Sequence, residues 1–418
     1  MISTQTITNL ILRPLSELSI KMSPDVSPND VFNRIDKNML MTIDRGLTTD
    51  FGDLIRRLMS GFAVLIIDGV TTAFSLGVQG FVTRGVDDSS SESNIYGAHE
   101  GFVEVVRSNM SLVRRRIKSP KLKFELFPVT KTSNVDIVLA YMQDRVPSSL
   151  INKIKYRLKD MDMESLLGTG YIEPYISDTR LSFFSGVSTT ERPDVFCAKL
   201  LEGRIGILID GSPYSIMLPY LFVENFQTLD DYNFRPYYTT LIRWIRYTAF
   251  FLAIFLPAIY VAMITFHPEL FNHTLIVTLA AAEQLAPLPL AIEALIVLFS
   301  FEIIREAGLR LPKNVGGVVS FVGGLLIGDA AVSAGIISNP LLLVCAISVT
   351  ASFVIPSLNQ PITVLRMIVI IAGGVSGLYG IALLAAAMLI NICSLESHGA
   401  PVMAPLSPFT LKSMRDVL

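Results

Sequence analysis

Cysteine and histidine are scarce in this sequence of 418 residues, which holds three cysteines and four histidines. Cys197, Cys345 and Cys393 are far apart, which excludes a disulfide framework or a paired metal site, and we expect buried thiols. His99 is the one histidine before residue 240, and no Gly-rich loop ending in Lys-Ser or Lys-Thr is present to cradle a phosphate. The chain therefore lacks the usual residues of a metal centre, a cofactor site or an enzyme active site.

Charged residues are also few, at 17% of the chain against about 25% in an average soluble protein. The deficit lies in the C-terminal part, since only six of the 34 basic and eight of the 36 acidic residues follow Arg246. The part before Arg246 has the balanced composition of a soluble domain. The net charge of −2 argues against nucleic acid as the main partner.

The N-terminal sequence, MISTQTITNL, has neither the basic segment nor the long apolar segment of a secretory signal. The first long apolar stretch is residues 247–266, 20 residues without a charge, which as a helix spans about 30 Å, one bilayer core. Arg243, Trp244 and Arg246 precede it, and basic residues beside an aromatic one are typical of a cytoplasmic membrane boundary. We therefore expect a multi-pass membrane protein whose N-terminal region is cytoplasmic.

Four further apolar stretches follow, at residues 285–304, 315–337, 341–355 and 362–392. The third of these is too short for an upright span, and the last is too long for one, so we expect Gly373-Gly374 to bend or divide it. The pattern predicts an all-α transmembrane domain of four to six spans over residues 241–395. Residues 396–418 form a tail that we expect to return to the cytoplasm.

Residues 1–240 mix strand and helix signals. Asp-Gly pairs at 68–69 and 210–211 each join two apolar strand-like runs, which predicts two β-hairpins. Residues 101–118 place their apolar side chains on one helical face. We expect an α/β or α+β cytoplasmic region with two subdomains, residues 1–120 and 121–240.

The predicted helix at 101–118 ends in three successive arginines, Arg114, Arg115 and Arg116. A solvated helix end accounts for such a run, and the alternative is a contact with a partner protein or with lipid headgroups. We treat the three as candidate partner-contact residues.

Charged residues inside the apolar stretches are the other candidates, because an ionisable group at mid-bilayer costs roughly 2.5 to 3.5 kcal/mol. Glu293 has no partner on its own helix and is a candidate ion-path or subunit-pairing residue, with a hydrogen-bonded structural role as the alternative. Glu302 lies nine residues later, on the opposite helical face, and we expect it to pair with Arg305. Asp329 is a second ion-path or subunit-pairing candidate, with a structural pair to Arg366 as the alternative.

Several ordered segments resemble one known family. They include GFVEVVRSNMSLVRRRIK at 101–118, TTERPDVFCAKLLEGRIGILIDGSPY at 189–214, PLPLAIEALIVLFSFEIIREAGLRLPK at 287–313 and SHGAPVMAPLSPFTLKSMRDVL at 397–418. With these segments the chain resembles the A subunits of the GerA-type spore germinant receptors. Family members commonly have a longer N-terminal segment, so we expect part of the first subdomain to be missing here.

The resemblance implies a specific setting. The A subunit would act with a B subunit that resembles an amino-acid transporter and binds the nutrient, and with a C subunit that is a lipoprotein. The complex would lie in the inner membrane of the dormant spore. A ring of A subunits would conduct cations once the nutrient binds.

The leading hypothesis is therefore an oligomeric, ligand-gated cation channel or signal-transducing subunit that triggers germination. The alternative is a transporter-like permease with a regulatory soluble domain. Permeases usually show more spans or inverted repeats than this sequence does. An enzyme ranks third, because the soluble region has no catalytic constellation.

Overall fold

The computed structural model describes residues 4–16, 27–38, 45–78, 92, 96–128, 135–178, 182–284, 286–311, 324, 328–409, 414 and 417. The chain divides into two compact units. Unit 1 comprises Met1–Arg180 and Ser185–Tyr220, and unit 2 comprises Leu181–Phe184 and Leu221–Leu418. The division falls at Tyr220, so residues 221–240 belong with the helices that follow them.

The first part of unit 1 is a small antiparallel sheet with short helices. Its elements are α1 (Thr4–Ile7), η1 (Thr8–Leu12), α2 (Arg13–Ser16), α3 (Pro28–Asn38), β1 (Arg45–Thr48), α4 (Phe51–Met59), β2 (Phe62–Leu65) and β3 (Ala73–Gly77). The strands lie in the order β1-β3-β2. Asp68-Gly69 lies in the turn between β2 and β3, which confirms the first predicted hairpin.

The second part of unit 1 is built on a five-stranded sheet. Its elements are α5 (Val106–Arg116), β4 (Leu122–Pro128), β5 (Asp136–Met142), α6 (Ser148–Lys159), η2 (Thr169–Tyr171), α7 (Glu173–Ile176), β6 (Ser188–Thr190), α8 (Pro193–Leu201), β7 (Ile205–Ile209) and β8 (Ser215–Leu218). The strand order is β4-β5-β7-β8-β6, and every neighbouring pair is antiparallel. Asp210-Gly211 joins β7 to β8, which confirms the second predicted hairpin.

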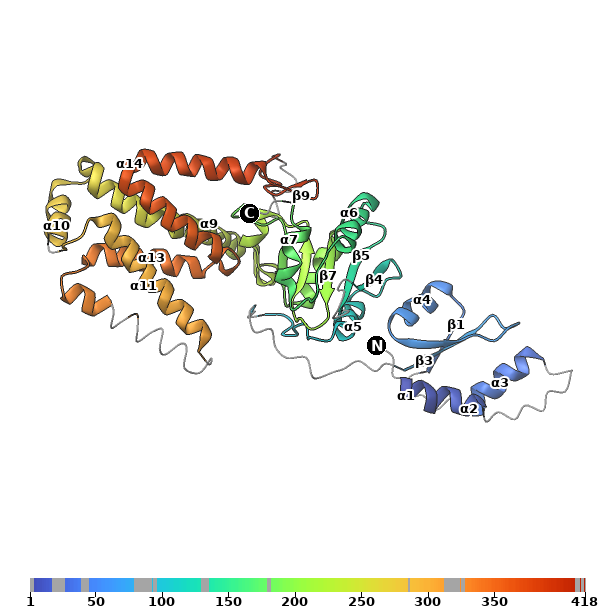
Figure 1. The fold of residues 1–418 in the computed structure, drawn as a ribbon. Coiled ribbons are helices and arrows are strands. Elements are labelled where there is room, and N and C mark those ends of the chain that lie inside the picture. The colour runs from blue at the N-terminus through green and yellow to red at the C-terminus, as the bar shows by residue number, and fades with distance from the viewer. Residues whose placement is uncertain are drawn as a thin grey trace. The chain divides into compact units, whose positions relative to one another are not determined.

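Side chains alternate along the central strands of this sheet and enter two cores, one on each face. Ile137 and Leu139 pack with α6, whereas Val138 and Ala140 pack with α5 and α8. Helices therefore cover both faces of an antiparallel sheet, an α+β fold (Figure 1). The predicted subdomain limit at residue 120 falls inside this fold, because α5 and β5 share one core.

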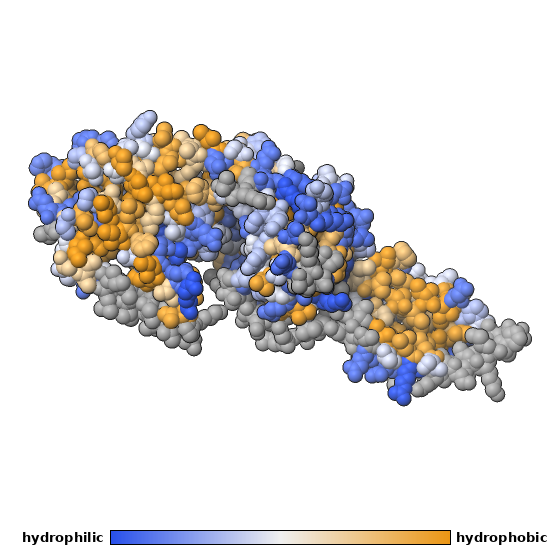
Figure 2. Space-filling view, viewed as in Figure 1, coloured by the Kyte–Doolittle hydropathy of each residue, from blue (hydrophilic) through white to orange (hydrophobic). Residues whose placement is uncertain are grey.

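Unit 2 is almost entirely helical. Its elements are η3 (Phe222–Phe226), η4 (Leu229–Tyr232), α9 (Pro236–Phe266), η5 (Pro268–Leu270), α10 (His273–Glu283), α11 (Leu290–Arg310), α13 (Asn339–Phe353), η6 (Pro356–Leu358), α14 (Asn359–Ser394), β9 (Glu396–Ser397) and β10 (Ala400–Pro401). Apolar residues fill its core and also spread over the visible surface of the helices, drawn in orange in Figure 2. Within the described residues, two stretches are long and apolar enough to cross a membrane, Pro236–Phe266 and Pro356–Ser394.

The helices of unit 2 run between two ends, which we call the linker end, at Phe222, and the distal end, at Phe266. α9 leads from the linker end to the distal end. α11 starts near the distal end, where its Ala291 and Val261 of α9 both lie close to Gly374. α13 starts at the same place, because Glu293 in the first turn of α11 accepts a hydrogen bond from the N–H of Ser338, which precedes α13.

Gly377 breaks α14 into two helices, with φ of 62° and ψ of −150°. The predicted bend at Gly373-Gly374 is wrong, since the chain is helical there. Beyond the break the chain turns back, so that Ile381 lies against Gly373, and the tail reaches the linker end, where the N–H of Phe222 donates to the carbonyl of Val402 at 2.8 Å. Among the described residues, five helical segments run between the ends, namely α9, α11, α13 and the two halves of α14.

Two further expectations have mixed outcomes. Most of the predicted stretch 315–337 lies outside the described residues, which resume continuously at 328. Cys197 and Cys345 are buried as expected, but the expectation of a buried thiol is wrong for Cys393, which is exposed near the end of α14.

Candidate functional site

The main cluster of buried charge in unit 2 joins Glu302 and Arg305 of α11 with Arg366 of α14. Arg366 is fully buried, and it donates from Nη2 to Glu302 at 3.0 Å and from Nη1 to the hydroxyl of Ser348 at 3.2 Å. Glu302 also forms an ion pair with Arg305 and accepts a hydrogen bond from the hydroxyl of Thr363 at 3.1 Å. One carboxylate therefore serves two guanidinium groups.

This cluster carries a net charge of +1 inside an apolar bundle. The Nε–H groups of Arg305 and Arg366 are buried without an acceptor among the described residues. Removing two charges from water costs several kcal/mol for each ion, and the pairing offsets this only in part. The cluster links α11, α13 and α14, but its energetic cost favours a functional role over simple stabilisation.

The pair between Asp329 and Arg366 that we weighed from the sequence does not form. Asp329 is exposed, whereas Arg366 is buried and bonded to Glu302. The reason is the packing of α11 against α14, which brings together two residues 64 positions apart. Hydropathy gives no information on which residue of one helix meets which residue of the next.

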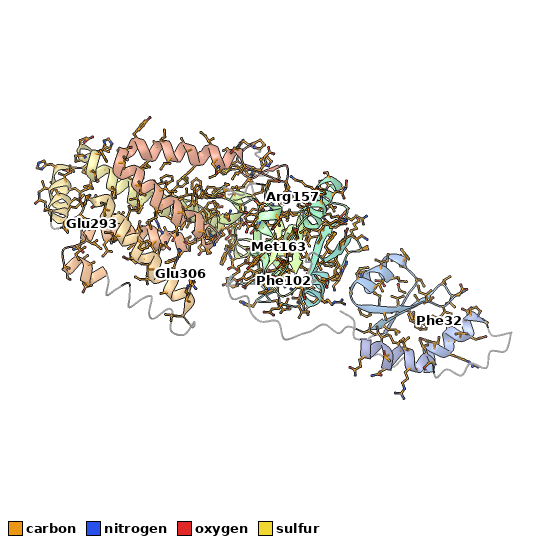
Figure 3. The ribbon with its side chains drawn as sticks, in the orientation of Figure 1. Phe32, Phe102, Arg157, Met163, Glu293 and Glu306 are labelled. Atoms are coloured by element: carbon orange, nitrogen blue, oxygen red, sulfur yellow. The ribbon has the colours of Figure 1, made fainter. Side chains whose placement is uncertain are left out.

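Glu293 is 1% exposed and faces the interior of unit 2. It accepts a hydrogen bond from the N–H of Ser338, and it lies within electrostatic reach of Tyr260 in α9 and Glu283 in α10. Tyr260 donates its hydroxyl to Glu283 at 3.0 Å. Figure 3 shows Glu293 near α10 and Glu306 farther along α11. Sequence reasoning had not singled out Glu283 or Tyr260, because neither shows a periodic signal that points to Glu293.

Asp231 is a second site that the sequence reasoning missed. Its side chain is 1% exposed and accepts hydrogen bonds from Arg243 at 3.2 Å and from Arg246 at 2.6 Å, both in the first turns of α9. Burial alone would raise the pKa of Asp231, but the hydrogen bonds from Arg246 and from Thr228 hold it below its usual value. The arginines that we assigned to a membrane boundary therefore also hold the linker segment against α9.

The three arginines at the end of α5 are occupied within unit 1. Arg115 and Arg116 both pair with Glu100. Arg114 donates to the carbonyls of Ser119 at 2.9 Å and of Leu122 at 3.1 Å. These internal contacts account for the run, so a partner contact is not needed to explain it.

A shallow groove of about 720 Å³ lies in unit 1 between the α6–α7 connection and the β7–β8 turn. Its lining includes three tyrosines and no acidic, basic or histidine side chain; the tyrosines are Tyr171, Tyr175 and Tyr214. Within the described part of the chain, no three residues among His, Cys, Asp and Glu are grouped to hold a metal ion.

The whole chain, residues 1–418, matches the family model described as Bacillus/Clostridium GerA spore germination protein. The chain is 40% identical to spore germination protein KA of Bacillus subtilis (strain 168), over 87% of this chain and 68% of that protein. It is 38% identical to the uncharacterized membrane protein YfkQ of the same organism, over 91% of this chain and 75% of that protein. Spore germination protein GerLA of Bacillus cereus is 35% identical, over 89% and 76%.

A solved structure also matches part of the chain. It is the crystal structure of the N-terminal domain of the A subunit of the Bacillus megaterium spore germinant receptor GerK3, with 29% identity and a TM-score of 0.39. The match covers 53% of this chain and 79% of that one.

Proposed function

Because the chain belongs to the GerA family of spore germination proteins, we propose that it is the A subunit of a nutrient germinant receptor. In this proposal several copies assemble into a ring that forms a ligand-gated cation channel, and its opening triggers germination. A transporter-like B subunit binds the nutrient, and a lipoprotein C subunit completes the complex in the inner spore membrane.

The observation that carries the proposal is the buried charge of unit 2. Arg366 is fully buried, and Glu302 and Arg305 complete a charged cluster among helices that are otherwise apolar. Ionisable residues inside a membrane domain are costly and usually mark a path for ions or a coupling element. The five helical passes of the described residues are fewer than a self-contained transporter of the repeat type usually has, which supports a pore shared between copies.

The position of the tail also supports a topology. The N–H of Phe222 donates to the carbonyl of Val402, so the tail lies at the linker end, where the first turns of α9 carry Arg243, Trp244 and Arg246. Basic residues beside tryptophan favour the cytoplasmic side for that end. We place both unit 1 and the C-terminal tail in the cytoplasm.

Asp329 and Glu293, the two carboxylates proposed for the ion path or for subunit pairing, have different surroundings. Asp329 is exposed, so it is available to a neighbouring copy of the chain. Glu293 is buried between α11 and the start of α13, so its role belongs to the interior of one copy. We propose Asp329 for subunit pairing and Glu293 for ion binding.

Reconstitution tests the proposal. The chain would be purified with its B and C subunits, its oligomeric mass measured in detergent, and the complex placed in vesicles loaded with a cation-sensitive dye. We expect a symmetric oligomer and a cation flux that rises when nutrient is added. Asp329→Asn should lower the oligomeric mass, whereas Glu306→Gln, a change of the same size at an exposed carboxylate, should not. A monomer that gives no flux with both partners present would contradict the proposal.

A further inference from the structure

The chain passes from one unit to the other at three peptide bonds, 180–181, 184–185 and 220–221. Leu181–Phe184 therefore belongs to unit 2, although α7 and β6 on either side of it belong to unit 1. We call residues 182–184, the part of this segment that the structure describes, the inserted loop. A short piece of the N-terminal sequence thus packs as part of the helical unit.

The inserted loop is held by the helices of unit 2. Phe184 is 3% exposed, and its ring lies edge-on to that of Phe222, with 5.3 Å between the centroids. Phe222 contacts Phe250 of α9 in a similar edge geometry at 5.7 Å. The hydroxyl of Ser182 donates to the side-chain carbonyl of Asn391, in the second half of α14, at 3.1 Å. The loop is therefore linked to α14 directly and to α9 through one ring.

The residues directly after the inserted loop are held in unit 1. The hydroxyl of Ser185 donates to the carboxylate of Glu173 in α7 at 2.8 Å. The carbonyl of Gly186 accepts a hydrogen bond from the N–H of Tyr220 at 2.8 Å. The second and third crossings therefore run side by side, and each is fixed within unit 1 just before or after it changes unit.

These two crossings have almost no slack. One peptide bond separates Phe184, which is buried in unit 2, from Ser185, which is bonded to α7 in unit 1. At the third crossing only Leu221 lies between Tyr220, bonded in unit 1, and Phe222, packed in unit 2. A linker absorbs a displacement through its free residues, each of which adds at most about 3.3–3.6 Å of reach. A movement of α7 must therefore either break the hydrogen bond of Ser185 or displace Phe184.

We propose that the inserted loop couples α7 of unit 1 to α9 and α14 of unit 2, with Phe184 as its anchor in the helices. Two domains of one chain move independently by default, and a connection without slack makes the equilibrium of one depend on that of the other. The coupling deepens the proposed function and rests on it for what the helices do, which is to open and close the path of the cation. The coupling itself can be measured without any flux.

A Gly-Gly insertion between Phe184 and Ser185 tests the coupling, because it keeps every side chain and adds up to about 7 Å of reach. The control is the same insertion between Glu164 and Ser165, two exposed residues in the connection before η2. Each insertion is combined with Ile176→Val, which leaves a small cavity at the buried end of α7. Hydrogen exchange is then measured on the full chain in detergent.

Ile176→Val should make the amides of residues 175–177 exchange about 2- to 12-fold faster. In the chain without an insertion, and in the control, the amides of Phe222–Phe226 should also exchange faster. With the insertion after Phe184 they should keep their original rates. If Ile176→Val left the exchange of Phe222–Phe226 unchanged in the chain without an insertion, or raised it equally with the insertion after Phe184, the inference would be overturned.

Cation flux in vesicles, with the B and C subunits present, tests the role of the loop in gating. The insertion after Phe184 should lower the nutrient-evoked flux by at least about fivefold, the low end of allosteric couplings, and the control insertion should retain it. Full nutrient-evoked flux with the insertion after Phe184 would overturn the role of the loop and leave the channel in place. Coupled hydrogen exchange without flux from any chain, the unchanged one included, would remove the channel and leave the coupling.

Discussion

At the scale of single residues, Glu302 holds two arginines with different surroundings. Arg366 is fully buried, whereas the side chain of Arg305 is 27% exposed. Removing the Glu302 carboxylate and removing the Arg366 guanidinium should therefore have different effects on stability. Removing one partner of a buried pair is costly mainly because the other charge is left unpaired.

Glu302→Gln should destabilise the chain by about 3–5 kcal/mol, because it leaves Arg366 buried and unpaired. Arg366→Met should change stability far less, since Glu302 keeps its pair with Arg305 and the methionine suits an apolar site. Thermal unfolding of the two variants in detergent measures the difference. If Arg366→Met lowered the unfolding midpoint as much as Glu302→Gln, the excess positive charge of the cluster would not be what makes Glu302 important.

Glu100 gives a prediction on pH. Burial alone would raise its pKa, but the hydrogen bond and charge of Arg115, with those of Arg116, hold the pKa of Glu100 below its usual value of 4.5. A carboxyl group with a lowered folded pKa stabilises the protein above its unfolded pKa, and this contribution disappears as the pH falls through the folded value.

Arg115→Met should therefore lower the denaturation midpoint of unit 1 at neutral pH, and the difference from the unchanged protein should shrink below about pH 4.5. Urea denaturation at several pH values measures this. Arg107→Met, on the same helix but with no carboxylate in ion-pair distance among the described residues, is the control, and its effect should not change with pH. A pH-independent difference for Arg115→Met would mean that the pair has no part in acid sensitivity.

At the scale of elements, α14 depends on one residue for its reversal. The backbone of Gly377, with φ of 62° and ψ of −150°, lies in a region that is almost restricted to glycine. A Cβ there would also lie 3.2 Å from the side chain of Phe266. The two halves of α14 are consequently separate passes, although the apolar sequence runs through them without interruption.

Gly377→Ala should destabilise unit 2 by roughly 1–3 kcal/mol, the cost of forcing a residue with a Cβ into this conformation. Gly328→Ala is the matched control, because a Cβ there meets only Leu342 at 3.6 Å, an ordinary contact, in a helical segment. Alanine favours helix over glycine, so the control should be neutral or slightly stabilising. Thermal unfolding of both variants measures the effect, and equal midpoints would argue that the break is not strained.

At the scale of the whole molecule, the two units have separate cores. The cores of unit 1 lie on both faces of its five-stranded sheet and in its small N-terminal sheet, and the core of unit 2 lies among its helices. A unit with its own core should fold by itself.

Residues 1–220 should therefore express as a folded fragment that unfolds cooperatively in urea. Circular dichroism and a denaturation curve would test this. Phe196→Ala within the fragment should cost about 3–5 kcal/mol, because Phe196 is fully buried against Gly206 in β7. If the fragment without any substitution were unfolded, unit 1 would need the helices of unit 2 in order to fold.

The proposed topology gives a prediction for the two ends of the chain. A reporter joined after Leu418 and one joined before Met1 should both be protected from a protease applied outside intact cells. A single cysteine in the α9–α10 connection, at Glu269, should instead react with an impermeant thiol reagent added from outside. Opposite protection of the two reporters would require an odd number of passes.

Much of this architecture was predictable from local sequence. The Asp-Gly pairs predicted both hairpins, because the turn needs residues that tolerate positive φ. The loss of charge after Arg246 predicted the apolar helices that follow, although α9 itself begins earlier, at Pro236. Glu302 and Arg305 lie one helical turn apart whatever surrounds them. These features depend on neighbours within a few positions.

Other features were decided by tertiary structure alone. Arg366 meets Glu302 and not Asp329, and Glu293 meets Ser338, because the rotation and register of packed helices depend on the whole set of side chains between them. The break at Gly377 was missed for the same reason, since nothing in an apolar run distinguishes a helical glycine from one at a reversal. The sequence by itself determined that charged residues lie among apolar helices, and only the packing of those helices decided which charges meet.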